Sequence, residues 1–77
     1  MKLSIYTKNN CIQCKMTKKF LTEHHISFEE HNVSSEPQYI TYLKEKGFRS
    51  VPVIEKNDAP IINGFRPDLL KNLVANF

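Results

Sequence analysis

The chain has 77 residues, of which 40% are hydrophobic and 25% charged, and a formal net charge of +3. This length allows one small domain, and the composition is that of a globular protein rather than a disordered or fibrous one. No apolar run approaches the ~20 residues that span a bilayer, and the amino terminus turns polar too early for a signal peptide. We therefore expect a single domain over residues 1–77, in the cytoplasm, that binds no membrane. Without a basic stripe interleaved with aromatic residues, nucleic acid is not an expected partner either.

The first segment predicts a strand followed by a helix. Residues 2–6 are a short β-rich run that can be buried inside a sheet. From Ile12 the apolar residues recur at helical spacing to about residue 24, and Met16 is expected on the buried face. Asn9 or Asn10 is expected to cap this helix at its start.

The next segment predicts a second strand and a second helix. Residues 26–33 alternate apolar and polar side chains, as a half-buried strand does. Ser35 and Gln38 have the spacing of a capping box, Pro37 suits a first helical turn, and Gly47 suits a helix end. A helix is therefore expected between Ser35 and Gly47.

The last third predicts a hairpin and a final helix. Two short apolar runs are joined by the turn residues Lys56, Asn57 and Asp58, and a leucine-rich helix begins at Pro67. The first two strands, separated by a helix, should pair in parallel, and the last two should pair antiparallel. We predict an α/β fold in the order β-α-β-α-β-β-α, with a four-stranded mixed sheet flanked by three helices.

Cys11 and Cys14 are the candidate chemical centre. Cys11 falls at the first turn of a predicted helix, where free backbone N–H groups and the helix dipole favour a thiolate. Only the thiolate attacks a disulfide, so a lowered pKa would make Cys11 a useful nucleophile. Cys14 is close enough to attack the resulting mixed disulfide, which leaves the pair oxidised. A C-x-x-C pair at a strand-to-helix junction of a β-α-β unit strongly indicates redox chemistry.

Other uses of the two cysteines are less well supported. A purely structural disulfide is disfavoured in a reducing cytosol. A zinc site would need two more ligands, and the three histidines match no familiar spacing, so no metal is expected. An inert interaction module with vestigial cysteines is a third alternative, and the presence of both cysteines at the helix start counts against it.

Pro52 lies at the start of the third predicted strand, where proline is tolerated. A cis Val51–Pro52 bond would leave the backbone of Val51 free beside the cysteines. From the local sequence alone such a bond is not expected, because only about 5–6% of X–Pro bonds are cis.

Three stretches, IYTKNNCIQCKMTK, GFRSVPVI and NGFRPDLLKNL, resemble the NrdH-redoxins, which are glutaredoxin-like members of the thioredoxin superfamily. The pair CIQC differs by one conservative residue from the usual C-V-Q-C, and GFRPD is the second diagnostic run. The resemblance implies a thioredoxin/glutaredoxin-like fold, Cys11 as nucleophile, Cys14 as resolving thiol and a cis Pro52. Ile62 and Asn63 depart from the usual tryptophan and serine, which affects the details of partner docking.

The resemblance also implies a function. NrdH-redoxins are reduced by thioredoxin reductase, which draws on NADPH, and they reduce the disulfide of a class Ib ribonucleotide reductase. We therefore expect a monomeric thiol–disulfide oxidoreductase without a bound cofactor, whose partners are the reductase and the ribonucleotide reductase large subunit. The residues expected to contact partners are Lys8, Ile12, Gln13, Val51, Pro52, Gly64, Phe65 and Arg66. For Phe65, packing in the core is the stronger expectation.

A glutathione-dependent glutaredoxin is the alternative within redox chemistry. Lys8 matches the basic residue that such proteins use for a glutathione carboxylate, and Ser50-Val51-Pro52 resembles their Thr-Val-Pro. The tetrapeptide CIQC lacks their Pro-Tyr, however. Arg66 and Pro67 also stand where a Thr-Asp would bind the glutathione amino group, and proline offers not even an N–H.

Overall fold

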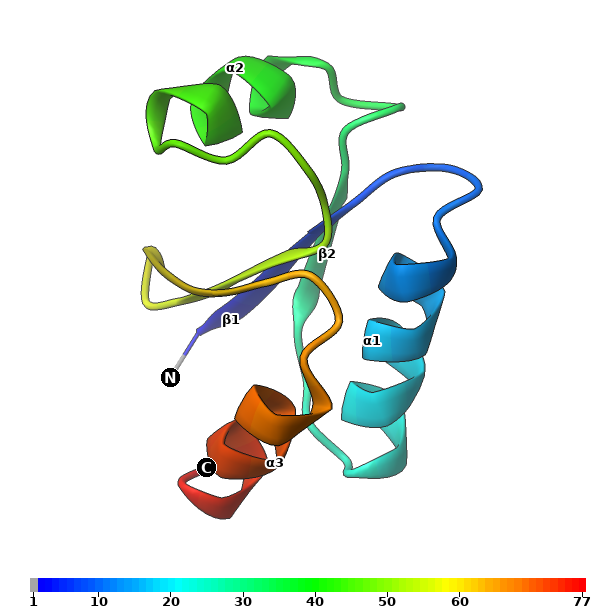
Figure 1. The fold of residues 1–77 in the computed structure, drawn as a ribbon, viewed down its shortest axis with the longest axis vertical. Helices are drawn as coiled ribbons and strands as arrows, with labels where there is room; N and C mark the ends of the chain where they lie inside the picture. The colour runs from blue at the N-terminus through cyan, green and yellow to red at the C-terminus, as the bar shows by residue number, and fades with distance from the viewer. Residues whose placement is uncertain (1) are drawn as a thin grey trace.

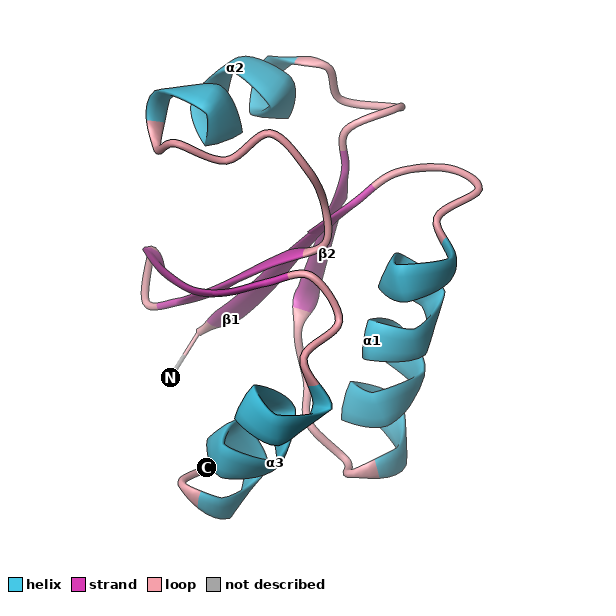
Figure 2. Cartoon of the chain, viewed as in Figure 1, coloured by secondary structure: helices cyan, strands magenta, loops and turns pink. Residues whose placement is uncertain are grey.

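The computed structural model describes residues 2–77, which form one mixed sheet with helices on both of its faces (Figures 1 and 2). The elements in chain order are β1 (Leu3–Thr7), α1 (Ile12–Glu23), β2 (Glu29–Asn32), α2 (Gln38–Glu45), β3 (Val53–Lys56), β4 (Ala59–Asn63) and α3 (Pro67–Ala75). The strand order is β2-β1-β3-β4. β1 pairs in parallel with β2, and the other two pairings are antiparallel. The predicted α/β fold, element order and strand directions are confirmed. Among residues 2–77, no helix has both the length and the apolar character to cross a membrane.

Two apolar clusters cover the two faces of the sheet. The cluster beneath α1 and α3 consists of Leu3, Ile5, Leu21, Ile54, Ile62, Leu70 and Leu73. The cluster beneath α2 consists of Tyr6, Val33, Leu43 and Val53. Alternation along β1 directs Ile5 to the first cluster and Tyr6 to the second. Figure 1 accordingly shows α2 across the sheet from α1 and α3.

Local backbone chemistry fixes the hairpin and the final helix as predicted. Asn57 and Asp58 have φ values of 51° and 68°, the left-handed conformation that a tight two-residue hairpin turn requires. Pro67 occupies the start of α3, and Asp68 lies in its first turn. Both features favour a helix start, because proline lacks an N–H that would have no partner there and an acid complements the helix dipole.

The predicted N-caps of α1 and α2 are wrong, whereas Gly47 ends α2 as predicted, with a φ of 90° directly after the C-cap Lys46. The N-cap of α1 is Cys11 itself, whose Sγ accepts the backbone N–H of Cys14 at 3.1 Å. Asn10 instead has a φ of 57° in the preceding loop. Helix α2 begins at Gln38 rather than at Ser35, and no side chain caps it, so the capping box does not form. The residue before the helix, Pro37, already has helical dihedral angles.

The predictions for the buried face of the first helix and for the length of the second strand also need correction. Met16 is 40% exposed, and the buried residues of α1 are Cys14, Thr17 and Leu21. Thr17 tolerates burial because its hydroxyl donates to the carbonyl of Gln13 at 2.8 Å. The second strand spans only Glu29–Asn32, and the apolar residues before it pack on the core from a loop.

A buried carboxylate supports α2 from the sheet. Glu55 on β3 is 1% exposed. It accepts hydrogen bonds from the hydroxyls of Tyr6 at 2.8 Å and Tyr42 at 2.7 Å, and Lys46 lies 3.5 Å away. Burial and the bond to Glu55 raise the pKa of Tyr6 above its ordinary value, so its phenol remains a hydrogen-bond donor. No sequence pattern indicated that this carboxylate is buried, because Glu55 lies in a short run otherwise suited to a buried strand.

Candidate active site

The two cysteines are joined by a disulfide at the start of α1, with their Cα atoms 5.2 Å apart. Cys14 is 2% exposed, whereas Cys11 is only partly buried. A partner can therefore approach Cys11 more readily than Cys14. This asymmetry favours Cys11 as the residue that reacts first, with Cys14 behind it.

The start of α1 offers positive potential to the Cys11 sulfur. Its Sγ accepts a backbone N–H from the first turn of the helix, and that turn carries no acidic residue. Lys8 and Lys15 are exposed on either side of the pair in sequence. Free N–H groups at a helix start and nearby cations both stabilise a thiolate over a thiol.

Hydrogen bonds connect the cysteine pair to the loop that precedes α3. The side-chain oxygen of Gln13, which lies between the cysteines, accepts the N–H of Phe65 at 3.3 Å. Gly64 has a φ of 87°, and its N–H donates to the carbonyl of Pro52 at 2.8 Å. Phe65 packs against the main core, as expected. Gln13, Pro52, Gly64 and Phe65 are thus brought together by contacts within the chain.

The segment before β3 has the cis peptide bond between Val51 and Pro52 that the family resemblance implied. Asn63 at the end of β4 braces this segment, since its amide donates to the carbonyls of Ser50 at 3.1 Å and Pro52 at 3.2 Å. A cavity of about 190 Å³ adjoins the same segment beneath α2 and is lined mainly by Val33, Ile40, Leu43, Phe48, Arg49 and Val51.

The remaining predicted partner residues face solvent. Ile12 is 71% exposed, and Lys8 is exposed as well. Arg66 lies at the N-cap of α3 and forms an ion pair with Asp68 at 3.3 Å. The hydrogen bond from Arg66 holds the pKa of Asp68 below its ordinary value. Partner contact by Lys8, Ile12 and Arg66 stays a prediction.

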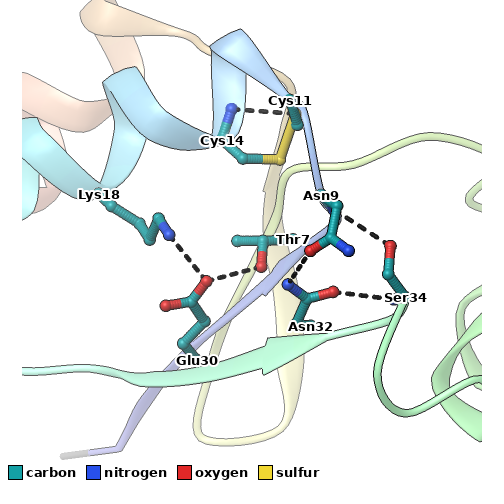
Figure 3. A network of polar contacts seen from close by, with 8 residues as sticks. All are labelled: Thr7, Asn9, Cys11, Cys14, Lys18, Glu30, Asn32 and Ser34. Carbon is teal, nitrogen blue, oxygen red and sulfur yellow. Dashed lines mark hydrogen bonds and ion pairs between the residues drawn. A yellow bond between two sulfur atoms is a disulfide. The ribbon is translucent and has the colours of Figure 1, made fainter.

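Two polar networks beside the cysteines had no counterpart in the sequence-based predictions (Figure 3). In the first, Glu30 accepts from Thr7 at 2.8 Å and from Lys18 at 2.9 Å. The feature of the sequence that could have indicated this network is the spacing of Lys18, four residues after Cys14. Parallel pairing of β1 with β2 then places Glu30 close to Thr7.

The second network fixes the loop that carries Cys11. The backbone N–H of Asn9 donates to Ser34 Oγ at 3.1 Å, and Asn32 Nδ2 donates to Asn9 Oδ1 at 3.0 Å. The N–H of Ser34 closes the ring on Asn32 Oδ1 at 2.8 Å (Figure 3). Within residues 2–77, no group of three or more histidine, cysteine or acidic side chains is placed to hold a metal ion.

Comparison with known proteins places this site in a family. The glutaredoxin family matches residues 3–61. The glutaredoxin-like protein NrdH of Lactococcus lactis subsp. lactis is 48% identical over 71 residues, which is 92% of this chain and 97% of that protein. The NrdH protein of Escherichia coli K12 is 38% identical over 73 residues, covering 95% and 89% of the two chains.

Solved structures agree with this assignment. The structure of the E. coli NrdH-redoxin, described as a glutaredoxin-like protein with a thioredoxin-like activity profile, matches with a TM-score of 0.86, 38% identity and 95% coverage of both chains. The thioredoxin-like protein BC3987 matches with a TM-score of 0.79 and 25% identity over 94% of this chain and 99% of that one. With its C-x-x-C disulfide at the start of α1, the chain is a thiol–disulfide oxidoreductase of the glutaredoxin family and belongs to its glutaredoxin-like NrdH group.

Proposed function

We propose that the protein is a cytoplasmic, monomeric electron carrier that thioredoxin reductase reduces with electrons from NADPH. It then reduces the disulfide of the large subunit of a class Ib ribonucleotide reductase. It needs no bound cofactor, because two thiols carry both electrons. The reducing state of cytoplasmic thiols suits such a carrier.

The reaction has two exchange steps. The Cys11 thiolate attacks one sulfur of the partner's disulfide, the partner's S–S bond breaks, and the departing sulfur takes up a proton. The Cys14 thiol then loses its proton and attacks Cys11 Sγ, which breaks the mixed disulfide and releases the partner's second sulfur as a thiol. The partner gains two electrons and two protons, and this chain ends with the Cys11–Cys14 disulfide. Thioredoxin reductase reverses the change in the carrier.

The start of α3 is the observation that favours this reductant over glutathione. Pro67 there has no N–H to offer, and the carboxylate of Asp68 is already paired with Arg66 at 3.3 Å. A glutathione amino group would need a free carboxylate at this place. The resemblance to the E. coli NrdH-redoxin, with its thioredoxin-like activity profile, supports the same choice.

Two coupled assays test the choice of reductant. The oxidised protein is mixed with NADPH and either thioredoxin reductase or glutathione plus glutathione reductase, and NADPH consumption is followed. We expect rapid turnover in the first assay and little in the second, with Cys11→Ser inactive in both. Faster turnover with glutathione would overturn the proposal in favour of a glutaredoxin.

The electron acceptor needs its own assay. The reduced protein is added to an oxidised class Ib ribonucleotide reductase without any other reductant, and deoxyribonucleotide formation is measured. We expect product to rise in proportion to the carrier added and to be lost with Cys11→Ser. Product that does not depend on the carrier would refute this part of the proposal.

A further inference from the structure

The Glu30 carboxylate lies on β2, across Thr7 and Lys18 from the cysteine pair, and takes no part in the two exchange steps. One oxygen, Oε2, accepts both the Thr7 hydroxyl at 2.8 Å and the Lys18 ammonium at 2.9 Å (Figure 3). The Lys18 and Glu30 side chains are 36% and 35% exposed. An ion pair that is partly withdrawn from water is screened less by salt than a fully exposed one. The pair can therefore influence nearby charges.

The helical spacing of Lys18 places one end of this ion pair near Cys14. Lys18 follows Cys14 by four residues, so the two side chains lie on the same side of α1, one turn apart. Thr7 is 1% exposed and ends the strand from which the Cys11 loop departs. Figure 3 shows Thr7, Lys18 and Glu30 on the side of the pair that faces the sheet. Glu30, which lies on β2, thus connects the middle of α1 at Lys18 to the end of β1 at Thr7.

Most of the other charged side chains around the two cysteines are cationic. Lys8 precedes it, Lys15 and Lys18 follow it on α1, and Arg66 begins α3, where Asp68 pairs with it. Burial tends to raise the pKa of Glu30, but the hydrogen bonds from Lys18 and Thr7 more than offset it, so the pKa lies below its ordinary value. Glu30 is consequently an anion at neutral pH and cancels the charge of Lys18.

We propose that Glu30 is a positioning residue that holds the Lys18 ammonium and neutralises it, and so limits how strongly the reduced cysteine pair is stabilised as a thiolate. The consequence is a more reducing pair. A dithiol whose reduced form is strongly stabilised becomes an oxidant, as in the most oxidising members of the superfamily. Glu30 therefore keeps the protein suited to donating electrons, an inference that rests on its proposed function as an electron donor.

Single and double variants test this role on the isolated protein. Thiolate formation is followed by ultraviolet absorbance as the pH is raised, and the reduced fraction is measured at equilibrium with dithiothreitol and its disulfide, an exchange of two electrons and two protons. Glu30→Gln keeps the shape and an acceptor oxygen but removes the charge. We expect its thiolate to form at lower pH and its equilibrium to shift toward the dithiol by a factor on the order of 2 to 10. Lys18→Met should shift both readouts the other way, and the double variant should lie near the unaltered protein.

Glu29→Gln is the matched control, since Glu29 neighbours Glu30 on β2 but pairs with Lys2 at 3.3 Å. It should leave both readouts unchanged. A Glu30→Gln protein that behaves like the control would overturn the proposal. Shifts in the same direction for Glu30→Gln and Lys18→Met would also overturn it. The two variants remove opposite charges, so a shared direction would point to a general loss of structure rather than to an effect of charge. No reductase or ribonucleotide reductase is used, so failure here is distinguishable from failure of the proposed function.

Discussion

Removing the Tyr6 hydroxyl should cost this small protein a large share of its stability. In Tyr6→Phe, Glu55 Oε1 loses its donor at 2.8 Å while Glu55 remains 1% exposed. A buried charged group that loses a hydrogen bond destabilises the fold by about 2–3 kcal/mol. A 77-residue domain has a free energy of unfolding of only ~4–12 kcal/mol. The cost corresponds to a fall in Tm of roughly 8–24 °C.

Two further tyrosines calibrate the experiment. Tyr42→Phe should cost less, because Lys46 lies 3.5 Å from the Glu55 oxygen that Tyr42 also contacts. Tyr39→Phe should leave Tm unchanged, since the Tyr39 hydroxyl makes no hydrogen bond within residues 2–77, although its ring lies 5.3 Å from that of Tyr6. Thermal unfolding of the oxidised proteins by circular dichroism gives the comparison. Equal Tm values for Tyr6→Phe and Tyr39→Phe would refute the assignment of Glu55 as a charge that depends on its donors.

Three other outcomes are expected. Gly64→Ala and Gly47→Ala should each lower the free energy of unfolding by about 1–2 kcal/mol, because their φ values of 87° and 90° disfavour any side chain. Only Gly64→Ala should also slow disulfide reduction, because Gly64 lies next to Gln13, between the two cysteines. Denaturant titrations and insulin reduction measure the two effects, and an equal loss of activity in both variants would contradict the role of Gly64. Glu30 stabilises the fold fully above its unfolded pKa, near 4.5, and this contribution disappears as the pH falls through its lower folded pKa. The stability difference between the unaltered protein and Glu30→Gln should therefore be constant from pH 6 to 8 and shrink below about pH 4.5, and a difference that grew on acidification would contradict it. Cys14→Ser should trap a mixed disulfide between Cys11 and the partner, visible by mass spectrometry, because a serine hydroxyl cannot displace the partner's sulfur, and full turnover of that variant with glutathione would indicate a monothiol route.

The errors in the predicted helix starts share one cause. Sequence spacing identified possible caps, but the groups that bind the backbone N–H groups of a first turn depend on the tertiary structure. The side chain of Asn9 binds Asn32, which is 23 residues away in sequence, and Cys11 takes the cap position instead. The exposure of Met16 has a similar origin, since the direction in which α1 packs on the sheet selects its buried face.

The cysteine site also combines features that are local in sequence with contacts that depend on the tertiary structure. Its chemistry could be predicted because Cys11 and Cys14 are close in sequence and helix geometry alone sets their relation. Gln13 and Phe65 are 52 residues apart, and Lys18 and Glu30 are 12 apart. No local pattern indicates such contacts, because they depend on which strands pair and in which register.

The amino-acid sequence was enough to predict the order of helices and strands, the directions in which the strands pair and the identity of the two reactive cysteines. These follow from short-range rules of periodicity, turn chemistry and helix geometry. The three-dimensional packing was needed to establish which side chains surround the cysteines, which carboxylates are buried and which apolar residues stay exposed. Those outcomes depend on side chains that are distant in the chain and become neighbours only when the sheet and helices pack together.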